Sequence, residues 1–485
     1  MKLRLMLFAG VAAMMATACS NEDEVAVNPD PRGDALTFST SVGHSRATAT
    51  TAANLGDFRV VAKGVHPNGN IYENFLIGNA NGGDLATNDH SNIWTLDKNV
   101  YWPTSTPYAV FWAYTFSQKK DENKTDVLPR GVSFSFDVSD PTKAKLTGFT
   151  PVKNALEPQA GEYNEWNDGT DQTDMLVAFT SQKRSVNAST VDIQFKHALS
   201  QVRIQAKSDS KATTDHRIVK IKGAWLVNAK DKADFTATYS WDNTDNKATV
   251  TDNWENPVFA SGSFSAYGSF FRTPVVLGRN TGDSYNADPK ALVNESLMLI
   301  PQELTKWNKN QNEDGTQATD NGGAYILLLC RVELEHNGAY HEGADATDKD
   351  IKVKDNMHYH QQFPVSASNE FNDAEYGFVC VPVATTFEMG RKYLFTLDIC
   401  GATSGAGNYP PDLNDQFKKL VPKAAGDANK YDPFKAWTDE EPINLVIVDR
   451  AVKKVGDPVL DAPIQFSVTV DAWSDEWTSG TTDSF

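Results

Sequence analysis

The chain has 485 residues and a formal net charge of −18, with 45 Lys and Arg residues against 63 Asp and Glu residues. No cluster of Lys or Arg offsets this acidity, which argues against binding to nucleic acid or to an anionic lipid surface. After the first eighteen residues no run of about 18 apolar residues occurs, so the sequence predicts no later membrane-spanning helix.

The chain begins with a leader. Lys2 and Arg4 precede an apolar run from Leu5 to Met15, and small residues then lead to Cys19. A basic start, an apolar core of about 7–15 residues and small residues at the cut are typical of a secretory signal peptide. Because a cysteine follows directly, we predict that residues 1–18 are removed and that Cys19 is lipidated, which anchors the protein to a bacterial membrane. A secreted protein whose leader happens to end in cysteine is the alternative.

Residues 19–34 are predicted to form an acidic, flexible tether. Ser20–Glu24 is polar and acidic, and Pro29, Pro31 and Gly33 follow without any apolar periodicity. An acidic run after a lipidated cysteine resembles the surface-export signal of lipoproteins in some Gram-negative anaerobes. A solvated linker without any export role is the alternative.

The dominant apolar period in the rest of the chain is two. In the earliest segment, Leu36, Phe38, Thr40 and Val42 fall on one face of a predicted strand. The same alternation recurs in Val132–Val138, Tyr393–Ile399 and Ile464–Val470. Many short strands separated by Gly, Asn, Asp and Pro turns predict an all-β fold of β-sandwich type.

A domain boundary is predicted near residue 187, where one group of strands closes and the next group opens. This divides the chain into an N-terminal β-sandwich domain at 35–186 and a larger C-terminal β-sandwich domain with long loops at 187–485.

No sequence string typical of a nucleotide-binding loop, a serine hydrolase or a zinc protease occurs. His358 and His360 lie two apart on one strand face, with His336 and His341 earlier in the chain. Because the sequence places no third ligand, we predict exposed strand histidines, no metal and no cofactor. No carboxylate pair can be recognised as catalytic, so we predict that the protein is not an enzyme.

Three cysteines follow Cys19, and each lies in an apolar, strand-like run. They are Cys330, Cys380 and Cys400. Because three is an odd number, at least one of these thiols is unpaired or pairs with another chain. We predict buried, inert thiols, because free cysteine packs like a small hydrophobic residue.

The order of the motifs resembles the fimbrillin family of pilins, also called type V pilins. The resemblance runs across nearly the whole mature chain, and although each motif alone is weak, their order is more specific. Its landmarks are Leu36–Val42, Arg46–Thr48, Tyr101–Pro103, Val110–Tyr114, Asp174–Ala178, Phe195–Val202, Leu299–Gln302, Phe387–Tyr393 and Val468–Trp473.

This resemblance implies two tandem transthyretin-like Greek-key β-sandwich domains and assembly by donor-strand exchange. It implies that a lipidated precursor reaches the cell surface, where a trypsin-like protease cuts after a basic residue. The first strand then leaves, and a strand from another pilin subunit fills the groove that it vacates.

The residues themselves agree with this scheme. Loss of the strand at 36–42 would expose an apolar strip and unpaired backbone groups, which a donor strand of about 23 Å, at ~3.3 Å per residue, would cover again. Arg46 lies just past this strand in a polar segment, so we predict cleavage between Arg46 and Ala47. A cut after Arg32 would not release the strand. Ile464–Val470 is either a donor strand or the last strand of the second domain, in which case a tip or accessory subunit is favoured.

The predicted function is therefore a structural or adhesive pilus subunit in the outer membrane, with other pilin subunits and a maturation protease as partners and an unknown receptor. A surface glycan-binding lipoprotein of a nutrient-uptake system is the alternative. Such a protein would use exposed aromatic residues to stack on sugar rings, but the alternation predicts that Trp112 and Tyr114 belong to the core.

Overall fold

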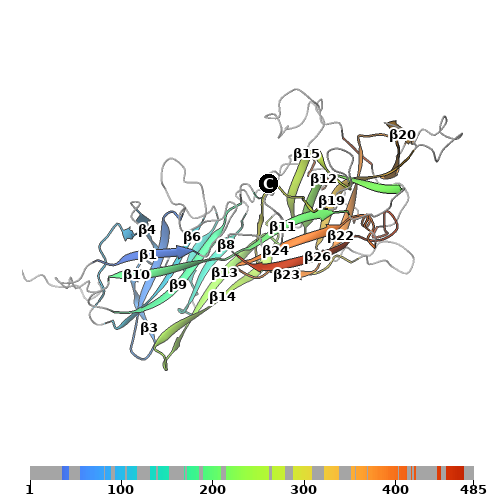
Figure 1. Ribbon diagram of the computed structural model, residues 1–485. Helices are drawn as coiled ribbons and strands as arrows, with labels where there is room; N and C mark the ends of the chain where they lie inside the picture. Colours follow the sequence, from blue (N-terminus) through green and yellow to red (C-terminus); the bar gives the residue numbers. More distant parts are fainter. Residues whose placement is uncertain are drawn as a thin grey trace, which may run out of the picture.

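The computed structural model is an elongated molecule with a lobe at each end (Figure 1). All its named regular elements are strands, which confirms the all-β prediction, and no helix that could cross a membrane is found in the described part. The residues described are 35–42, 55–80, 82–88, 93–103, 106–116, 131–137, 140–151, 169, 172–184, 189–208, 215–260, 265–278, 288–308, 322–337, 351–354, 357–366, 368, 370–401, 403–411, 417, 420–421, 445–448 and 455–473.

An eight-stranded sheet forms most of the first lobe. Its strands are β1 (Thr37–Val42), β2 (Phe58–Val65), β3 (Ile71–Ile77), β4 (Asp84–Asn88), β5 (Trp94–Leu96), β6 (Tyr108–Phe116), β9 (Met175–Lys183) and β10 (Thr190–His197). The strand order is β3-β2-β4-β5-β1-β10-β9-β6, and β6 also pairs with β2. The sheet therefore closes on itself, and alternate side chains of its strands fill the interior.

A second sheet covers part of the outer face of the first. It has the order β14-β13-β8-β7. Its strands are β7 (Ser133–Phe136), β8 (Lys143–Phe149), β13 (Lys232–Asp242) and β14 (Lys247–Val258). Val61 and Trp112 from the first sheet share a core with Phe235 and Trp254 from this one. Strand pairing crosses the predicted boundary at residue 187, because β10, β13 and β14 all join sheets of the first lobe.

The second lobe is a sandwich of two sheets. One contains β11 (Ser200–Lys207), β16 (Lys290–Ala291), β17 (Leu297–Leu299), β24 (Arg391–Asp398) and β26 (Gln465–Ala472). The other contains β12 (Asp215–Val227), β15 (Ala266–Leu277), β19 (Tyr325–Asn337), β20 (Ile351–Lys354), β21 (Met357–Phe363), β22 (Glu375–Pro382) and β25 (Val446–Ile447). A short ribbon of β18 (Glu303–Leu304) and β23 (Thr385–Thr386) lies beside them.

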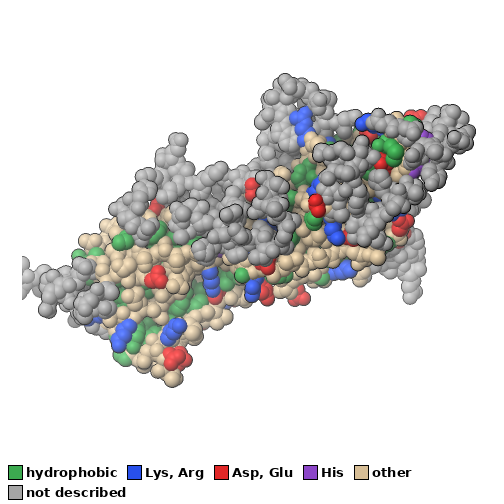
Figure 2. Space-filling view, in the orientation of Figure 1, with side chains coloured by type: hydrophobic (Ala, Val, Ile, Leu, Met, Phe, Trp, Pro, Cys, Tyr) green, Lys and Arg blue, Asp and Glu red, His purple; other side chains and the backbone are tan. Residues whose placement is uncertain are grey.

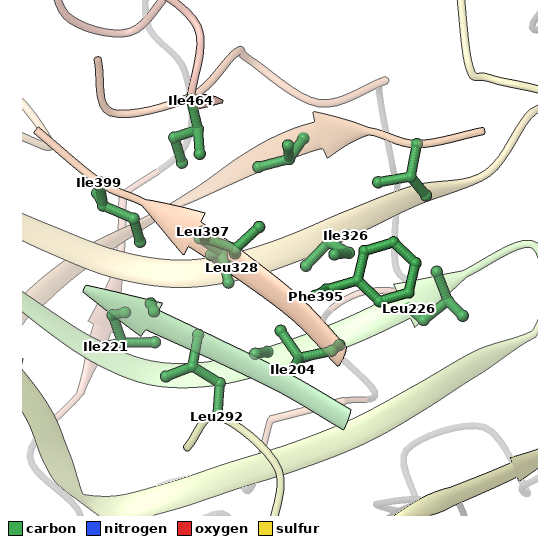
Figure 3. Close-up of a cluster of buried hydrophobic side chains, with 14 of the residues drawn as sticks. Ile204, Ile221, Leu226, Leu292, Ile326, Leu328, Phe395, Leu397, Ile399 and Ile464 are labelled. Atoms are coloured by element: carbon green, nitrogen blue, oxygen red, sulfur yellow. The ribbon is translucent and has the colours of Figure 1, made fainter. Parts of the chain in front are cut away.

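The two sheets bury one continuous core. In Figure 3, Ile204 of β11 and Phe395 of β24 face Ile326 and Leu328 of β19. The alternation that predicted a strand at 393–399 therefore marks the inward face of β24, because side chains at successive positions point to opposite faces. The Greek-key, two-domain detail of the predicted fold stays a prediction.

The cysteines lie in this second lobe. Cys330, Cys380 and Cys400 are buried, as predicted from their apolar surroundings, and form no disulfide within the described residues. Burial raises the pKa of the Cys400 thiol to about 12 and that of Cys330 still further. Both thiols are therefore protonated at neutral pH and are poor nucleophiles.

Candidate assembly site

β1 is bonded very differently along its two borders. On one side it runs parallel to β10 through six residue pairs, from Thr37 with Thr190 to Val42 with Phe195. On the other side it lies next to β5, and its ladder there has a single pair, Phe38 with Trp94. A backbone hydrogen bond from Leu36 N to Val100 O, 2.8 Å long, adds to that side. The strand therefore sits within the sheet but has full ladder pairing along one border only.

The apolar residues of β1 fill the interior of the closed sheet. Leu36, Phe38 and Val42 are buried, and Phe38 is completely inaccessible to solvent. The Phe38 ring lies 5.8 Å from that of Phe58 and 6.4 Å from that of Phe111, measured between centroids, both in edge-on contact. The alternation predicted this face, because the strand register directs these side chains into the core.

Thr40 is the exception on this face. Its residue is only half-buried, yet its hydroxyl oxygen Oγ1 is buried and has no hydrogen-bond partner among the described residues. A buried polar atom without a partner costs roughly 1–3 kcal/mol of desolvation. The hydroxyl group of Thr40 is therefore a local cost to stability within β1.

Thr40→Val is expected to raise the free energy of unfolding by about 1 kcal/mol, because it removes this unsatisfied hydroxyl and keeps the shape of the side chain. Thr37→Val is the matched control, because Thr37 Oγ1 is 3.0 Å from Thr190 Oγ1 and loses a hydrogen bond on substitution. Urea unfolding of both variants measures the difference. A Thr40→Val protein that unfolds at lower urea than the wild type would contradict this account of the strand.

The other predicted maturation residues lie outside the described residues. They are the lipidation residue Cys19 and the cleavage pair Arg46 and Ala47. β1 ends at Val42, so the chain between it and Arg46 is three residues long.

β26 is the last strand of the described chain and lies at the edge of its sheet. It pairs with β24 through eight residues, from Gln465 with Asp398 to Ala472 with Arg391. Its side chains are half-buried or exposed, and Val470 is 49% exposed. Within the described residues this segment is therefore paired with β24 of its own second lobe.

The end of β26 is attached to the junction between the lobes. Trp473 stacks on the imidazole of His197, with ring centroids 4.1 Å apart and an interplanar angle of 2°. His197 Nδ1 lies 2.8 Å from Asp174 Oδ2, and both side chains are almost fully buried. Trp473 N also donates to Gly390 O, and Gly390 N donates to Leu199 O, each over 2.9 Å. Three distant parts of the chain therefore meet where β10 ends and β11 begins.

Sequence reasoning did not identify this junction as a site. Its residues fall in separate motifs along the sequence, namely Asp174, His197, Gly390 and Trp473. The sequence feature that could have identified the junction is the type of these residues. A carboxylate, an imidazole and an indole in otherwise apolar strands need hydrogen-bond partners when they are buried. Further bonds reinforce the junction, since Trp254 Nε1 donates to Ala198 O over 2.7 Å and Ser200 Oγ donates to Glu388 O over the same distance.

A groove of about 730 Å³ lies beside this junction, between β14 and the β18–β23 ribbon. Polar residues such as Asn253, Gln302 and Glu303 contribute to its lining, together with Trp254. Trp254 is buried, with its indole nitrogen bonded as described above. Trp102, Trp112 and Tyr114 are also buried, as the alternation predicted for the latter two. None of these four aromatic side chains offers an open face to a sugar ring.

Comparison with known proteins identifies the family of this chain. Over an alignment of 371 residues the chain is 26% identical to the fimbrium subunit Fim1C of Phocaeicola vulgatus, and the alignment covers 71% of this chain and 86% of that protein. A crystal structure of a fimbrial protein from Bacteroides vulgatus is 17% identical, with a TM-score of 0.41 over 76% of this chain and 96% of that one. The family model described as fimbrillin-like matches residues 45–407, well over half of the sequence. The chain therefore belongs to the fimbrillin-like family.

Proposed function

We propose that this protein is a non-enzymatic structural or adhesive subunit of a surface pilus. In this proposal it is exported as a lipoprotein through Cys19, anchored in the outer membrane and assembled with other pilin subunits by protease-triggered strand exchange. Family membership supports the pilus, and the leader supports the anchor. The observation that carries the assembly mechanism is β1, which combines a buried apolar face with full pairing along one border only.

The groove that β1 would leave explains why a replacement is needed. Leu36, Phe38 and Val42 are each buried, and burial of one such side chain is worth about 1.5–3 kcal/mol. The three together amount to roughly 5–9 kcal/mol, which is comparable with the whole stability of a typical domain, about 5–15 kcal/mol. The groove would also carry the unpaired backbone edge of β10. An empty groove is therefore costly, and an incoming strand that restores both the ladder and the apolar contacts is strongly favoured.

Strand departure also has a defined geometry. The residue pairs with β10 and the contacts of Leu36 and Phe38 with the β5 side must break, which opens the closed sheet between β5 and β10. Proteolysis after Arg46 supplies the trigger, because it separates the strand from the rest of the lobe and makes its loss irreversible. We infer that β26 stays with its own lobe, so that this subunit accepts a strand and acts at the tip or as an accessory subunit.

Arg46→Ala is expected to abolish assembly. Incubation of the wild-type lipoprotein with a trypsin-like protease should give oligomer ladders that resist mild denaturant, and N-terminal sequencing should find a start at Ala47. The Arg46→Ala protein should remain monomeric. Arg32→Ala is the matched control and should assemble like the wild type, because a cut at residue 32 leaves the strand in place. A mature start at Cys19 or Ser20 in assembled material would reject this mechanism.

The alternative function is a surface glycan-binding lipoprotein of a nutrient-uptake system. It requires exposed aromatic side chains that stack on sugar rings. Trp102, Trp112 and Tyr114 are buried and so cannot provide such a surface. The same preparation distinguishes the two functions. A glycan-binding protein would stay monomeric after protease treatment and would be retarded in a polysaccharide gel, whereas the pilus subunit should form ladders and migrate freely.

A further inference from the structure

Three histidines meet at the end of the second lobe that points away from the first lobe. His336 lies near the end of β19, and His358 and His360 lie on β21. The β20–β21 hairpin forms the outer edge of this sheet, at the far end of the molecule in Figure 1. Figure 2 shows histidine side chains reaching the surface at the same end.

The strand register places all three imidazoles on one face. His336 is the direct antiparallel partner of His358, and directly opposed residues share a face of the sheet. His360 lies two residues further along β21 and so points to the same side. The ring centroid of His336 is 5.5 Å from that of His358 and 4.9 Å from that of His360. This is the third imidazole that the sequence alone did not place.

Two of the ring nitrogens already point at one another. His336 Nε2 and His360 Nε2 are 2.8 Å apart, a distance at which one ring donates a hydrogen bond to the other. Two imidazole nitrogens bound to one tetrahedral zinc ion at about 2.0–2.1 Å lie roughly 3.3 Å apart. An ion could therefore replace this hydrogen bond after small ring movements and a change of tautomer in the donating ring. Within the described residues no three ligands already surround one point, so His358 must turn its ring to join them.

The basic side chains on the neighbouring strands include Arg217 of β12, which lies opposite Leu334 on the histidine face and is paired with Gln362 and Asp461. Lys352 of β20 lies opposite Tyr359, on the other face from the histidines, and its ammonium group pairs with Asp373. His336 and His358 are buried and His360 is half-buried, so the prediction of exposed strand histidines was wrong, because the strand register turns these side chains toward one another. His360 is therefore the member of the cluster with the most access to solvent, from which water or a further ligand could complete the coordination.

We propose that His336, His358 and His360 bind one divalent transition-metal ion of the class that imidazole prefers, such as zinc, nickel, copper or cobalt. The ion would tie the edge hairpin β20–β21 to β19. This inference goes beyond the pilus function and does not depend on it, because a metal site at this end of the second lobe is remote from β1.

Cobalt and zinc titrations of the full chain, after removal of metal with a chelator, test the site. The visible absorption of bound cobalt and the heat of zinc binding should both give one ion per chain. His336→Gln and His360→Gln should each weaken binding at least about tenfold, since even supporting residues around a metal change affinity by about 10–100-fold. His66→Gln is the matched control, because His66 also packs against a second ring, that of Tyr72, but lies in the first lobe, away from the cluster. The His66→Gln protein should bind metal like the wild type.

The thermal midpoint gives a second measurement. Zinc should raise the midpoint of the wild type and of His66→Gln but not that of the two cluster variants. Circular dichroism without metal establishes that each variant is folded, and if the buried His336 position does not tolerate change, the half-buried His360 position decides. The proposal is overturned if no metal binds, if His360→Gln binds within twofold of the wild type, or if His66→Gln loses binding equally.

Discussion

A chain that starts at Ala47 is expected to lose most of the stability of its first lobe and to recover it when a synthetic peptide of residues 35–42 is added. The three buried apolar side chains of β1 account for about 5–9 kcal/mol. The peptide should restore them together with the backbone ladder to β10. Denaturant unfolding with and without peptide, monitored by tryptophan fluorescence, measures both the loss and the rescue.

Two altered peptides sharpen this experiment. A Phe38→Ser peptide should fail to rescue, because Phe38 is the completely buried residue that touches Phe58 and Phe111. A Ser41→Ala peptide should rescue as well as the original, since Ser41 is exposed. Equal rescue by both peptides, or a truncated chain as stable as the full one, would show that β1 is not a replaceable part of the core.

Loss of Trp473 is expected to be the second large effect. Trp473→Ala should cost about 3–5 kcal/mol, the usual range for removal of a buried large aromatic side chain. His197→Ala should cost about as much, because it leaves the carboxylate of Asp174 without its imidazole partner in a buried site. Trp473→Ala should also loosen β26, whose end is held by the stack of Trp473 on His197.

Hydrogen exchange distinguishes this local role from general destabilisation. The amides of β26 should exchange faster in Trp473→Ala than in the wild type. Trp241→Ala is the control, since Trp241 is a half-buried tryptophan that packs against the core of the first lobe, and its loss should leave the amides of β26 protected. If β26 exchanges at the same rate in both variants, Trp473 does not hold the strand.

The sequence predicted the inward faces of individual strands well. The alternation of Leu36, Phe38 and Val42, and that of Phe395 and Leu397, corresponds to side chains that are buried in the structure. Alternation works because it depends only on the geometry of one strand and on which of its faces is buried. Thr40 shows its limit, because the period places a residue on a face but does not supply a partner for its hydroxyl group.

Strand neighbours could not be predicted in the same way. The parallel pairing of β1 with β10 joins residues more than 150 positions apart, and β13 pairs with β8 across the predicted domain boundary. The register between strands decides such contacts, and the period of a single strand does not contain it. The junction of Asp174, His197 and Trp473 and the approach of His336 to His360 were missed for this reason.

The route of the chain between the lobes has a mechanical consequence. β10 continues into β11 with only two residues between them, and the β13–β14 hairpin returns from the second lobe to pair with β8 of the first (Figure 1). A pulling force along the long axis would therefore load rows of backbone hydrogen bonds in shear, where many must break together. Under tension, such a subunit should resist extension as one rigid unit and should not extend or bend at a flexible linker between its lobes.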